Sequence, residues 1–493
     1  MNNSSIADTD ATKKINITLD KTGKSLKIKF IYLDWSIDPT YQGEFYEGLG
    51  SIMTLVKQAG HKISFLHVTQ LLEDQAILDF VSSDTDLVAF STTTNMFPLA
   101  KKWSFLLKEK YPGVPMLCGG NHPTLDPVST LEQSAIDWCC VGEGEGFMLD
   151  LCDAINGKRS LEDIPNLAYR KGDANGSKIT VNRSRLQEQN LDSIPVVDRT
   201  IFANHIANNE VAQVFTSRGC PYKCTFCCNE AKIDIYRGQG KAKTVRFFSP
   251  ERVINELLDL KKANPKLKFI EFVDDVFAVN MNWIRDFAVL YKKHINLPFH
   301  WAGYPQTLNN ERVELLVDMG GKVVTVGLQS GDDHIRSVVM DRKTPLKKMA
   351  LGMALLKKHN VHRIVDIIFG VPNETKQQMI QTIEVLAELD VDHAKSHIFY
   401  PYPGTELFNK SVEMGLVDKK KFRQDYHTGS VLNYSKSHKR TILFMHLYSQ
   451  KIVRILSGAY KSNYLKKTLT INFFRKIIFS YIFINTTMLS RSL

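Results

Sequence analysis

The stretch Cys220-Pro221-Tyr222-Lys223-Cys224-Thr225-Phe226-Cys227 carries three cysteines in a single short loop. Three residues separate the first two cysteines and two residues separate the last two, so the three thiolates can converge on one face of a turn. A cubane iron–sulfur cluster takes four ligands, so this loop would leave one iron without a protein ligand. An open iron can bind a small molecule through that molecule's own donor atoms. The spacing therefore indicates a catalytic cluster.

A zinc site and a cluster of merely buried thiols are the alternatives for this loop. Structural zinc sites usually show two Cys-x-x-Cys pairs or paired Cys and His. No partner pair accompanies the loop elsewhere in the chain, which favours the iron–sulfur interpretation. Cys228 adjoins a complete three-cysteine pattern, so we expect it to be a packed thiol rather than a ligand.

Length and composition indicate a globular protein of two or three domains. The chain has 493 residues, of which 43% are hydrophobic and 23% are charged. Residues 1–25 are rich in Asn, Ser, Thr and Asp, which predicts a flexible tail, and they contain no apolar run that a signal peptide would need. The eight cysteines form no even-spaced framework, which argues against secretion. We therefore expect a cytoplasmic protein.

The formal charge of +11 belongs to the C-terminal segment. Residues 426–493 contain no Asp or Glu and carry the whole excess of Lys and Arg, so the rest of the chain is neutral. Apolar residues recur in this segment at helical spacing, but no run reaches the roughly 20 residues of a spanning helix. We expect a basic helical segment. It would either pack on the preceding domain or contact the inner face of a membrane or a lipid-linked substrate.

Residues 26–160 alternate between short apolar strands and helical stretches. This pattern predicts an α/β domain with a doubly wound parallel sheet, whose ligands bind beyond the carboxyl ends of the strands. Glycine and small polar residues gather at three of those ends, in the segments 91–95, 119–123 and 142–145. Glycine lets a backbone approach a large ligand, and the polar groups offer hydrogen bonds. The predicted strands are Lys27–Leu33, Lys62–His67, Asp86–Ser91, Val114–Cys118 and Ile136–Val141.

Residues 161–205 are predicted to form a hairpin and a linker, and a second alternation follows in residues 206–425. Six strand–helix repeats predict a partial barrel of the (β/α)6 type, with its chemistry at the carboxyl ends of the strands. The cysteine loop follows the first of these strands, as that expectation requires. The predicted strands are Ala212–Thr216, Phe269–Val273, Phe299–Tyr304, Val323–Gly327, Ile364–Phe369 and Ala394–Phe399.

The cysteine loop resembles the signature of radical S-adenosylmethionine (SAM) enzymes, including the aromatic residue before its last cysteine. The resemblance implies that Cys220, Cys224 and Cys227 bind a [4Fe-4S] cluster, whose open iron takes the amino and carboxylate groups of SAM. Reductive cleavage would give a 5′-deoxyadenosyl radical. Phe226 would lie beside the adenine, and a flavodoxin or ferredoxin would donate the electron.

Segments after later strands of the predicted barrel resemble further SAM-binding motifs of this family. By that resemblance, Asp274 or Asp275 would meet the methionine ammonium, although either could instead be a turn or cap residue. Gln329 and Ser330 would approach the ribose hydroxyls. Related sequences usually carry Glu at the position of Gln329, so here an amide replaces a carboxylate.

The segment after the fifth predicted strand of the barrel resembles the adenine-binding motif of the family. Gly370 and Val371 would let the backbone approach the adenine. Glu374 is expected to shape the turn and to cap the following helix.

The N-terminal segments resemble those of cobalamin-binding domains that precede many radical SAM domains. The resemblance covers residues 26–160 and implies that the strand ends hold the corrin and its nucleotide tail. The Asp-x-His-x-x-Gly segment by which some cobalamin proteins ligate cobalt is missing, so no such histidine is expected below the cobalt. His122 would either line the cobalamin cleft or form a local hydrogen bond at its turn. The candidate cobalamin-binding residues are Ser91, Thr92, Thr93, Gly119, Gly120, His122, Gly142 and Glu143.

Together the resemblances imply a cobalamin-dependent radical SAM enzyme that acts on a small-molecule or lipid-linked substrate. Hydrogen abstraction followed by methyl transfer from methylcobalamin would make it a methyltransferase for an unactivated carbon. Cyclisation or rearrangement with the same cofactors is the alternative. A third class is a non-catalytic metal protein that binds nucleic acid through its basic tail, but no nucleic-acid partner is expected. A tRNA methylthiotransferase is disfavoured because its N-terminal domain should carry a second three-cysteine cluster.

Overall fold

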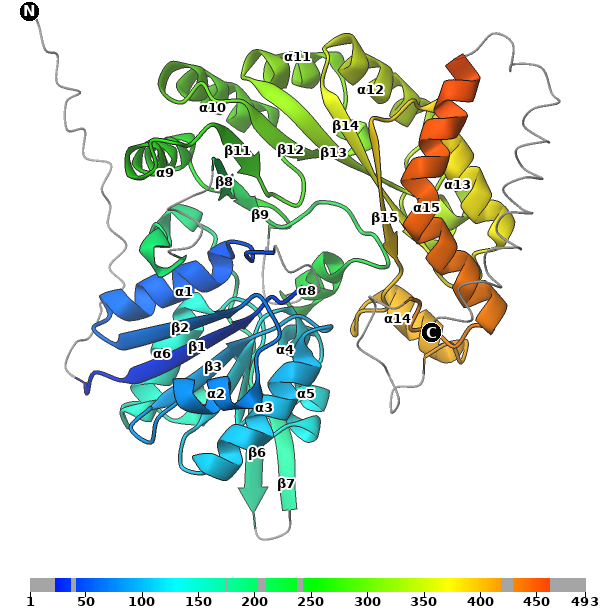
Figure 1. Cartoon of the computed structure of the whole chain (residues 1–493). Helices are drawn as coiled ribbons and strands as arrows, with labels where there is room; N and C mark the ends of the chain where they lie inside the picture. The colour runs from blue at the N-terminus through cyan, green and yellow to red at the C-terminus, as the bar shows by residue number, and fades with distance from the viewer. Residues whose placement is uncertain are drawn as a thin grey trace, which may run out of the picture.

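The computed structural model describes residues 23–36, 41–173, 176–202, 210–236, 243–417 and 429–461. Two α/β units are visible in Figure 1, each built on one sheet. We call the unit with strands β1–β7 the N-terminal unit, and the unit with strands β8 and β11–β15 the barrel unit. The predicted α/β class is confirmed. The predicted flexible tail, apart from residues 23–25, lies outside the described residues, as do residues 462–493.

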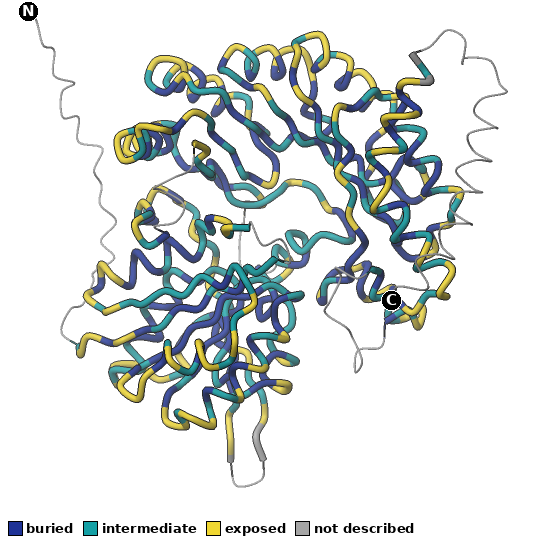
Figure 2. The backbone as a smooth tube through the Cα atoms, viewed as in Figure 1, coloured by how far each residue is buried: buried dark blue, intermediate teal, exposed yellow. Residues whose placement is uncertain are grey.

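The sheet of the N-terminal unit has the strand order β2-β1-β3-β4-β5-β6-β7, and its first five strands are parallel. Every residue of β3 (Leu87–Ser91) is buried, because helices cover both faces of the sheet. Figure 2 shows this sheet as a buried layer between more exposed helices. The doubly wound parallel arrangement is thus confirmed. The other parallel strands are β1 (Lys27–Leu33), β2 (Lys62–Val68), β4 (Met116–Gly119) and β5 (Trp138–Cys140).

Alternate residues of the parallel strands face two separate cores. Phe30 of β1 packs with α1 (Glu47–Gln58) and α6 (Glu145–Ile155) on one face. Ile31, the next residue, packs with the helices on the opposite face. Those helices are α2 (Asp74–Phe80), α3 (Phe97–Lys110) and α5 (Pro127–Gln133), whereas α4 (Asn121–Leu125) contacts β4 and β5.

The predicted hairpin belongs to the same sheet. Strand β6 (Leu167–Asp173) pairs antiparallel with β5, and β7 (Gly176–Val181) pairs antiparallel with β6. Arg170 on β6 donates hydrogen bonds to the carbonyl oxygens of Ile136, at 2.6 Å, and Ser134, at 2.9 Å. The hairpin therefore extends the N-terminal sheet by two antiparallel strands instead of serving only as a linker.

The barrel unit contains six parallel strands in the order β15-β14-β13-β12-β11-β8. Strands β8 and β15 form the two edges, and one apolar core joins the sheet to the surrounding helices. This is the predicted partial barrel. The strands are β8 (Val211–Val214), β11 (Phe269–Phe272), β12 (Phe299–Gly303), β13 (Gly321–Gln329), β14 (His362–Phe369) and β15 (His393–Ile398). The helices are α8 (Cys228–Tyr236), α9 (Pro250–Ala263), α10 (Met281–His294), α11 (Asn310–Asp318), α12 (Leu346–Lys358), α13 (Lys376–Glu388) and α14 (Glu406–Glu413).

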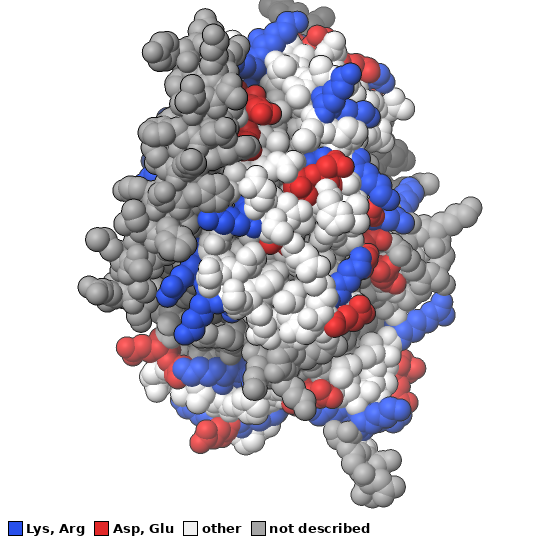
Figure 3. Space-filling model, turned by 90° about the vertical axis from the view of Figure 1, so that its right-hand side faces the viewer, with Lys and Arg blue, Asp and Glu red and all other residues white. Residues whose placement is uncertain are grey.

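The described part of the basic C-terminal segment, residues 429–461, contains the helix α15 (Lys436–Lys461). It packs on α13 and β15, and Ile442 and Met445 are buried in the barrel core. Figure 3 views the molecule from the right-hand side of Figure 1, where positive and negative side chains surround an uncharged centre. Within the residues that the structure describes, no helix has the length and apolar character needed to span a membrane.

Candidate functional site

A cavity of about 350 Å³ lies between the two units. On one side are the strand ends of the N-terminal sheet and the first turns of α1 and α6. On the other are α8 and a short antiparallel ribbon of β9 (Ser217–Arg218) and β10 (Arg246–Phe247). Five of the predicted cobalamin-binding residues line it: Ser91, Gly119, Gly120, Gly142 and Glu143.

The other three predicted cobalamin-binding residues do not line this cavity. His122 is buried, and its ring lies 4.2 Å from the ring of Phe97. Its backbone N–H donates to the carbonyl oxygen of Thr92 at 3.3 Å. Its Nδ1 lies 3.3 Å from the hydroxyl of Thr94, and burial lowers the pKa of His122 to about 4. The geometry matches the local hydrogen-bonding role that we weighed, with a neutral imidazole beneath the cavity. Thr93 bonds Asn95.

The turn that carries Glu143 requires glycine before it. Gly142 has a φ of +101°, and an added Cβ would lie 2.1 Å from the Tyr236 hydroxyl oxygen. That hydroxyl accepts a hydrogen bond from the backbone N–H of Glu143 at 3.0 Å. Because Tyr236 belongs to α8, this glycine lets the barrel unit contact the turn directly.

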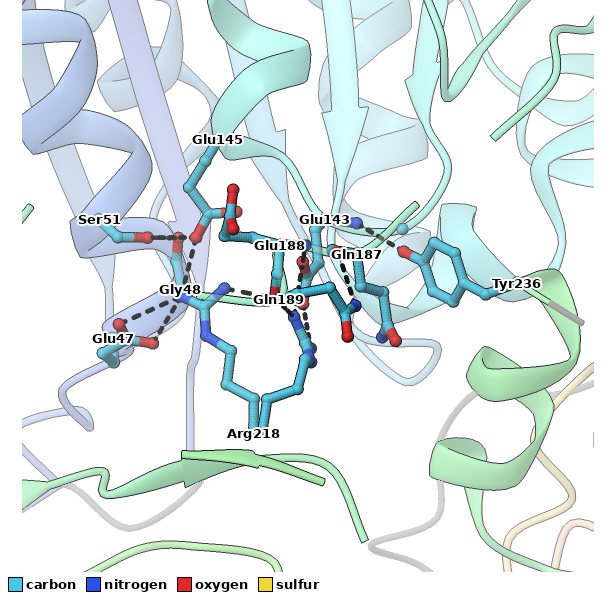
Figure 4. Close-up of polar contacts among 12 residues, drawn as sticks. Glu47, Gly48, Ser51, Glu143, Glu145, Gln187, Glu188, Gln189, Arg218 and Tyr236 are labelled. Atoms are coloured by element: carbon cyan, nitrogen blue, oxygen red, sulfur yellow. Dashed lines mark hydrogen bonds and ion pairs between the residues drawn. The ribbon is translucent and has the colours of Figure 1, made fainter. Parts of the chain in front are cut away.

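A network of buried ion pairs borders the cavity (Figure 4). Arg218 Nη2 lies 2.8 Å from Glu145 Oε1 and 3.1 Å from Glu47 Oε2. Next to it, Arg246 contacts both oxygens of Glu143, at 2.5 and 3.2 Å. Burial disfavours the charged form of Glu145, but the charge and hydrogen bond of Arg218 outweigh it and lower the pKa. For Glu47 the effect of burial is larger than that of the Arg218 charge, so the pKa of Glu47 is raised.

Glu143 is the one member of this network that was predicted as a site residue. Glu145 stood in the quoted 142–145 segment, and Arg218 stands two residues before the first cysteine of the loop. Their positions beside predicted motifs were the one sequence feature that could have indicated them as site residues. Their pairing was not predictable, because 73 residues separate them.

Backbone contacts hold the cysteine loop in place. Thr225 donates from its N–H to the Met340 carbonyl oxygen at 3.2 Å, and it accepts from the N–H of Leu407 at 3.0 Å. The N–H of Cys227 donates to the carbonyl oxygen of Cys224 at 3.0 Å. Gly219 precedes the loop with a φ of +96°, where an added Cβ would lie 2.1 Å from a backbone oxygen. These contacts fix the course of the loop.

The surroundings of Cys224 suit an anionic sulfur ligand, whereas burial raises the pKa of Cys220 to about 11 and a hydrogen bond with Cys228 raises the pKa of Cys227. Cys224 is buried, and its sulfur lies 3.5 Å from Arg342 Nη1. The Arg342 guanidinium also lies 4.0 Å from the ring centroid of Tyr304, which stacks on Tyr222 at 3.4 Å. A cation stabilises the thiolate form that binds iron. Across the described ranges, no three Cys, His, Asp or Glu side chains converge on a single metal ion. A cubane cluster does not need such convergence because each cysteine binds a different iron, so the donor set fits it.

The two candidate aspartates have different surroundings. Asp274 is buried and accepts hydrogen bonds from Thr216 Oγ1 at 2.8 Å and from the Ser217 hydroxyl. Burial raises its pKa to about 6. Asp275 is exposed and lines the cavity. Of the two alternatives, Asp275 is the carboxylate that can reach a ligand there, whereas Asp274 ties β11 to the start of the ribbon.

The remaining predicted SAM-binding residues lie away from the interdomain cavity. Ser330 is fully buried, and its hydroxyl lies 3.3 Å from that of Thr382. Gln329 adopts a φ of +69°, and its buried Oε1 has no hydrogen-bond partner. Val371 is buried, and Phe226 packs against the same small core. This core includes Leu407 and Phe408 of α14, and none of its residues lines the cavity.

Glu374 shapes its turn as expected but does not cap the following helix. It is buried, and it accepts a hydrogen bond from the N–H of Gly370 at 2.6 Å. Thr375 is the N-cap of α13, and its side chain forms a reciprocal capping box with Gln378. The capping prediction for Glu374 was therefore wrong by one residue.

Known families and proteins match this architecture. The radical SAM superfamily matches residues 214–386, and the B12 binding domain matches residues 47–151. An uncharacterised methyltransferase of Pyrococcus horikoshii is 28% identical over 429 residues, which cover 85% of this chain and 87% of that protein. Anaerobic magnesium-protoporphyrin IX monomethyl ester cyclase of Rubrivivax gelatinosus is 23% identical and covers 69% of this chain and 61% of the cyclase.

A solved structure extends the comparison. The radical SAM methyltransferase TsrM from Kitasatospora setae, with cobalamin and a [4Fe-4S] cluster bound, aligns with a TM-score of 0.63 at 15% identity. The alignment covers 79% of this chain and 78% of TsrM. At that identity the likeness concerns the fold. It extends over both units and agrees with the domain matches.

Proposed function

Because the chain belongs to the radical SAM enzymes that carry a B12 binding domain, we propose that it methylates an unactivated carbon of a small-molecule substrate. When bound, the cluster and SAM supply a 5′-deoxyadenosyl radical, and cobalamin supplies a methyl group. The observation that carries the proposal is the interdomain cavity. Its walls join the strand ends of the B12 domain to Gly219 and Asp275, beside the cysteine loop.

In this proposal the cysteine loop holds the iron–sulfur cluster. Cys220, Cys224 and Cys227 each bind one iron. Arg342 offsets negative charge at Cys224 from 3.5 Å. The backbone hydrogen bonds of Thr225 and Cys227 hold the loop that would bind the cluster.

The proposed SAM contacts begin with Asp275, whose exposed carboxylate accepts the methionine ammonium. The unpartnered Oε1 of Gln329 is a free acceptor for a ribose hydroxyl. The other contacts are proposed from the family resemblance alone: Phe226, Ser330, Gly370 and Val371.

For cobalamin, the glycines at the strand ends admit the corrin, and polar groups bind its rim. Gly119 and Gly142 line the cavity, and the missing side chain of Gly142 leaves room for the Tyr236 hydroxyl in its wall. Ser91 and Glu143 offer polar contacts at its edge. The proposed supporting residues below them are Thr92, Thr93, Gly120 and His122.

A cyclisation is the second candidate function, and the Rubrivivax cyclase relative favours it. The methyltransferase of Pyrococcus horikoshii supports methyl transfer more strongly because its match extends over most of both chains. Either reaction needs a one-electron donor, for which we propose a flavodoxin or ferredoxin in the cytoplasm.

The test is anaerobic reconstitution with iron, sulfide and hydroxocobalamin, followed by SAM, a strong reductant and candidate substrates. We expect 5′-deoxyadenosine and, in the presence of the substrate, S-adenosylhomocysteine. Cys224→Ala should abolish both, whereas Cys228→Ala should retain the cluster. A substrate that yields a cyclised product without S-adenosylhomocysteine would replace methyl transfer by the second candidate.

A further inference from the structure

We infer that Arg218 is a positioning residue that fixes the distance between the cysteine loop and the B12 domain. It touches neither the iron ligands nor the reacting atoms. The inference rests on the proposed function only for the identity of the two cofactors whose sites it connects.

Arg218 is rigidly connected to the cysteine loop. A single residue, Gly219, separates it from Cys220, and that glycine tolerates no side chain. On the other side, Arg218 pairs across the ribbon with Arg246. A movement of the Arg218 backbone would therefore move the start of the loop.

The partners of Arg218 are rigidly connected to the N-terminal unit. Glu47 and Glu145 are the first residues of α1 and α6, where the positive end of each helix favours a carboxylate. Ser51 donates a hydrogen bond to Glu145 at 2.7 Å, which orients the carboxylate toward Arg218. Figure 4 shows the guanidinium of Arg218 between the two carboxylates. One side chain thus joins two helices of the B12 domain to the cysteine loop.

The burial of these charges makes the contact specific. The side chains of Arg218, Glu47 and Glu145 are 14%, 12% and 14% exposed. Removing one partner from a buried ion pair leaves an uncompensated charge, which is strongly unfavourable. Without Arg218, Glu47 and Glu145 would gain by reaching water, and this part of the interface would open. Glu143 also lies 3.8 Å from Arg218 Nη1, but its closer contact with Arg246 would still hold the units together.

The spacing matters because the two cofactors must act on one substrate. A displacement of about 1 Å between reacting groups can reduce a rate about a hundredfold. Arg218 lies at the boundary between the sites of both cofactors. It is therefore placed to control their separation.

The first test is hydrogen–deuterium exchange on the anaerobically purified chain without added cofactors. The variants are Arg218→Gln, which leaves the carboxylates unpaired, and Arg218→Gln/Glu145→Gln, which removes one of those charges. The matched control is Arg285→Gln, from an Arg–Glu pair whose side chains are 52% and 61% exposed. We expect about tenfold faster exchange at the starts of α1 and α6 and in the cysteine loop for Arg218→Gln, and a smaller increase for Arg218→Gln/Glu145→Gln. Arg285→Gln should exchange at the wild-type rate.

The second test measures the distance between cob(II)alamin and the reduced cluster by pulsed electron paramagnetic resonance in the reconstituted protein. Arg218→Gln should broaden the distance distribution at an unchanged iron content. Arg218→Lys should restore it in part, because an ammonium cannot bridge two carboxylates as a guanidinium does. Unchanged exchange together with an unchanged distance distribution would overturn the inference. A wild-type chain that binds neither iron nor cobalamin would instead overturn the proposed function, while the exchange test would still decide the role of Arg218.

Discussion

Arg342 places its Nη1 atom 3.5 Å from the sulfur of Cys224, and its guanidinium is held there by two further contacts. It donates to the Gly327 carbonyl oxygen at 2.6 Å and lies over the ring of Tyr304. A fixed cation beside the cluster site should stabilise the extra electron that the cluster receives on reduction.

Arg342→Gln should therefore lower the reduction potential of the cluster. We expect a negative shift on the order of 50 mV, since removing the positive charge makes the reduced cluster less favourable. Potentiometric titration followed by electron paramagnetic resonance measures this shift. Arg342→Lys keeps the charge and should shift the potential less. A potential equal to that of the wild type in Arg342→Gln would show that the guanidinium serves only to pack the loop.

Gly142→Ala should weaken cobalamin binding. The new Cβ would overlap the Tyr236 hydroxyl, and a φ of +101° is strained for alanine. The unbound turn of the variant can relax out of the left-handed conformation, which costs a non-glycine residue about 1–2 kcal/mol. Binding must restore that conformation, so the affinity should fall about 5- to 30-fold. Titration with hydroxocobalamin, followed by visible absorption, measures the affinity. Gly113→Ala is the matched control, since an added Cβ there meets nothing within 4 Å.

Asp275→Asn should weaken SAM binding, whereas Asp274→Asn should mainly weaken folding. Asp275 is accessible, and a charge-assisted bond to an ammonium contributes about 1.5–3 kcal/mol, so its loss should raise the dissociation constant about tenfold or more. The carboxylate of Asp274 already accepts hydrogen bonds from Thr216 and Ser217. Equilibrium dialysis with labelled SAM and urea unfolding distinguish the two effects. Equal loss of SAM binding in both variants would contradict the assignment.

The positions of the strands could be predicted because each unit buries its strands in regular alternation with helices. The predicted Lys27–Leu33 strand coincides with β1, and all six barrel strands lie within a few residues of their predictions. The pairing of β6 with β5 was not predictable, since an antiparallel addition depends on contacts such as those of Arg170 that no local pattern encodes.

Site residues could be predicted from the sequence only where the residue type itself decides the chemistry. Three cysteines at this spacing favour an iron–sulfur cluster over zinc, and the three ligands stay a prediction. Asp274 and Asp275 could not be ranked from sequence, because adjacent side chains at the end of a strand point in opposite directions. The contacts of Arg218 join residues up to 171 positions apart, so only the folded chain reveals them.

Glu374→Gln should reduce the dependence of stability on pH. Burial raises the pKa of Glu374 to about 8 from a usual value of 4.5, so the folded chain holds this proton more tightly than the unfolded chain. The stability contributed by the protonated carboxyl is therefore complete below about pH 4.5 and is lost as the pH rises toward about 8. We expect the wild type to lose about 4 kcal/mol more than Glu374→Gln between about pH 5 and about pH 9, measured by urea unfolding. The glutamine keeps an acceptor for the N–H of Gly370, so the turn beside Val371 should survive. If both proteins lose the same stability over this range, the carboxyl of Glu374 is not the group that retains its proton.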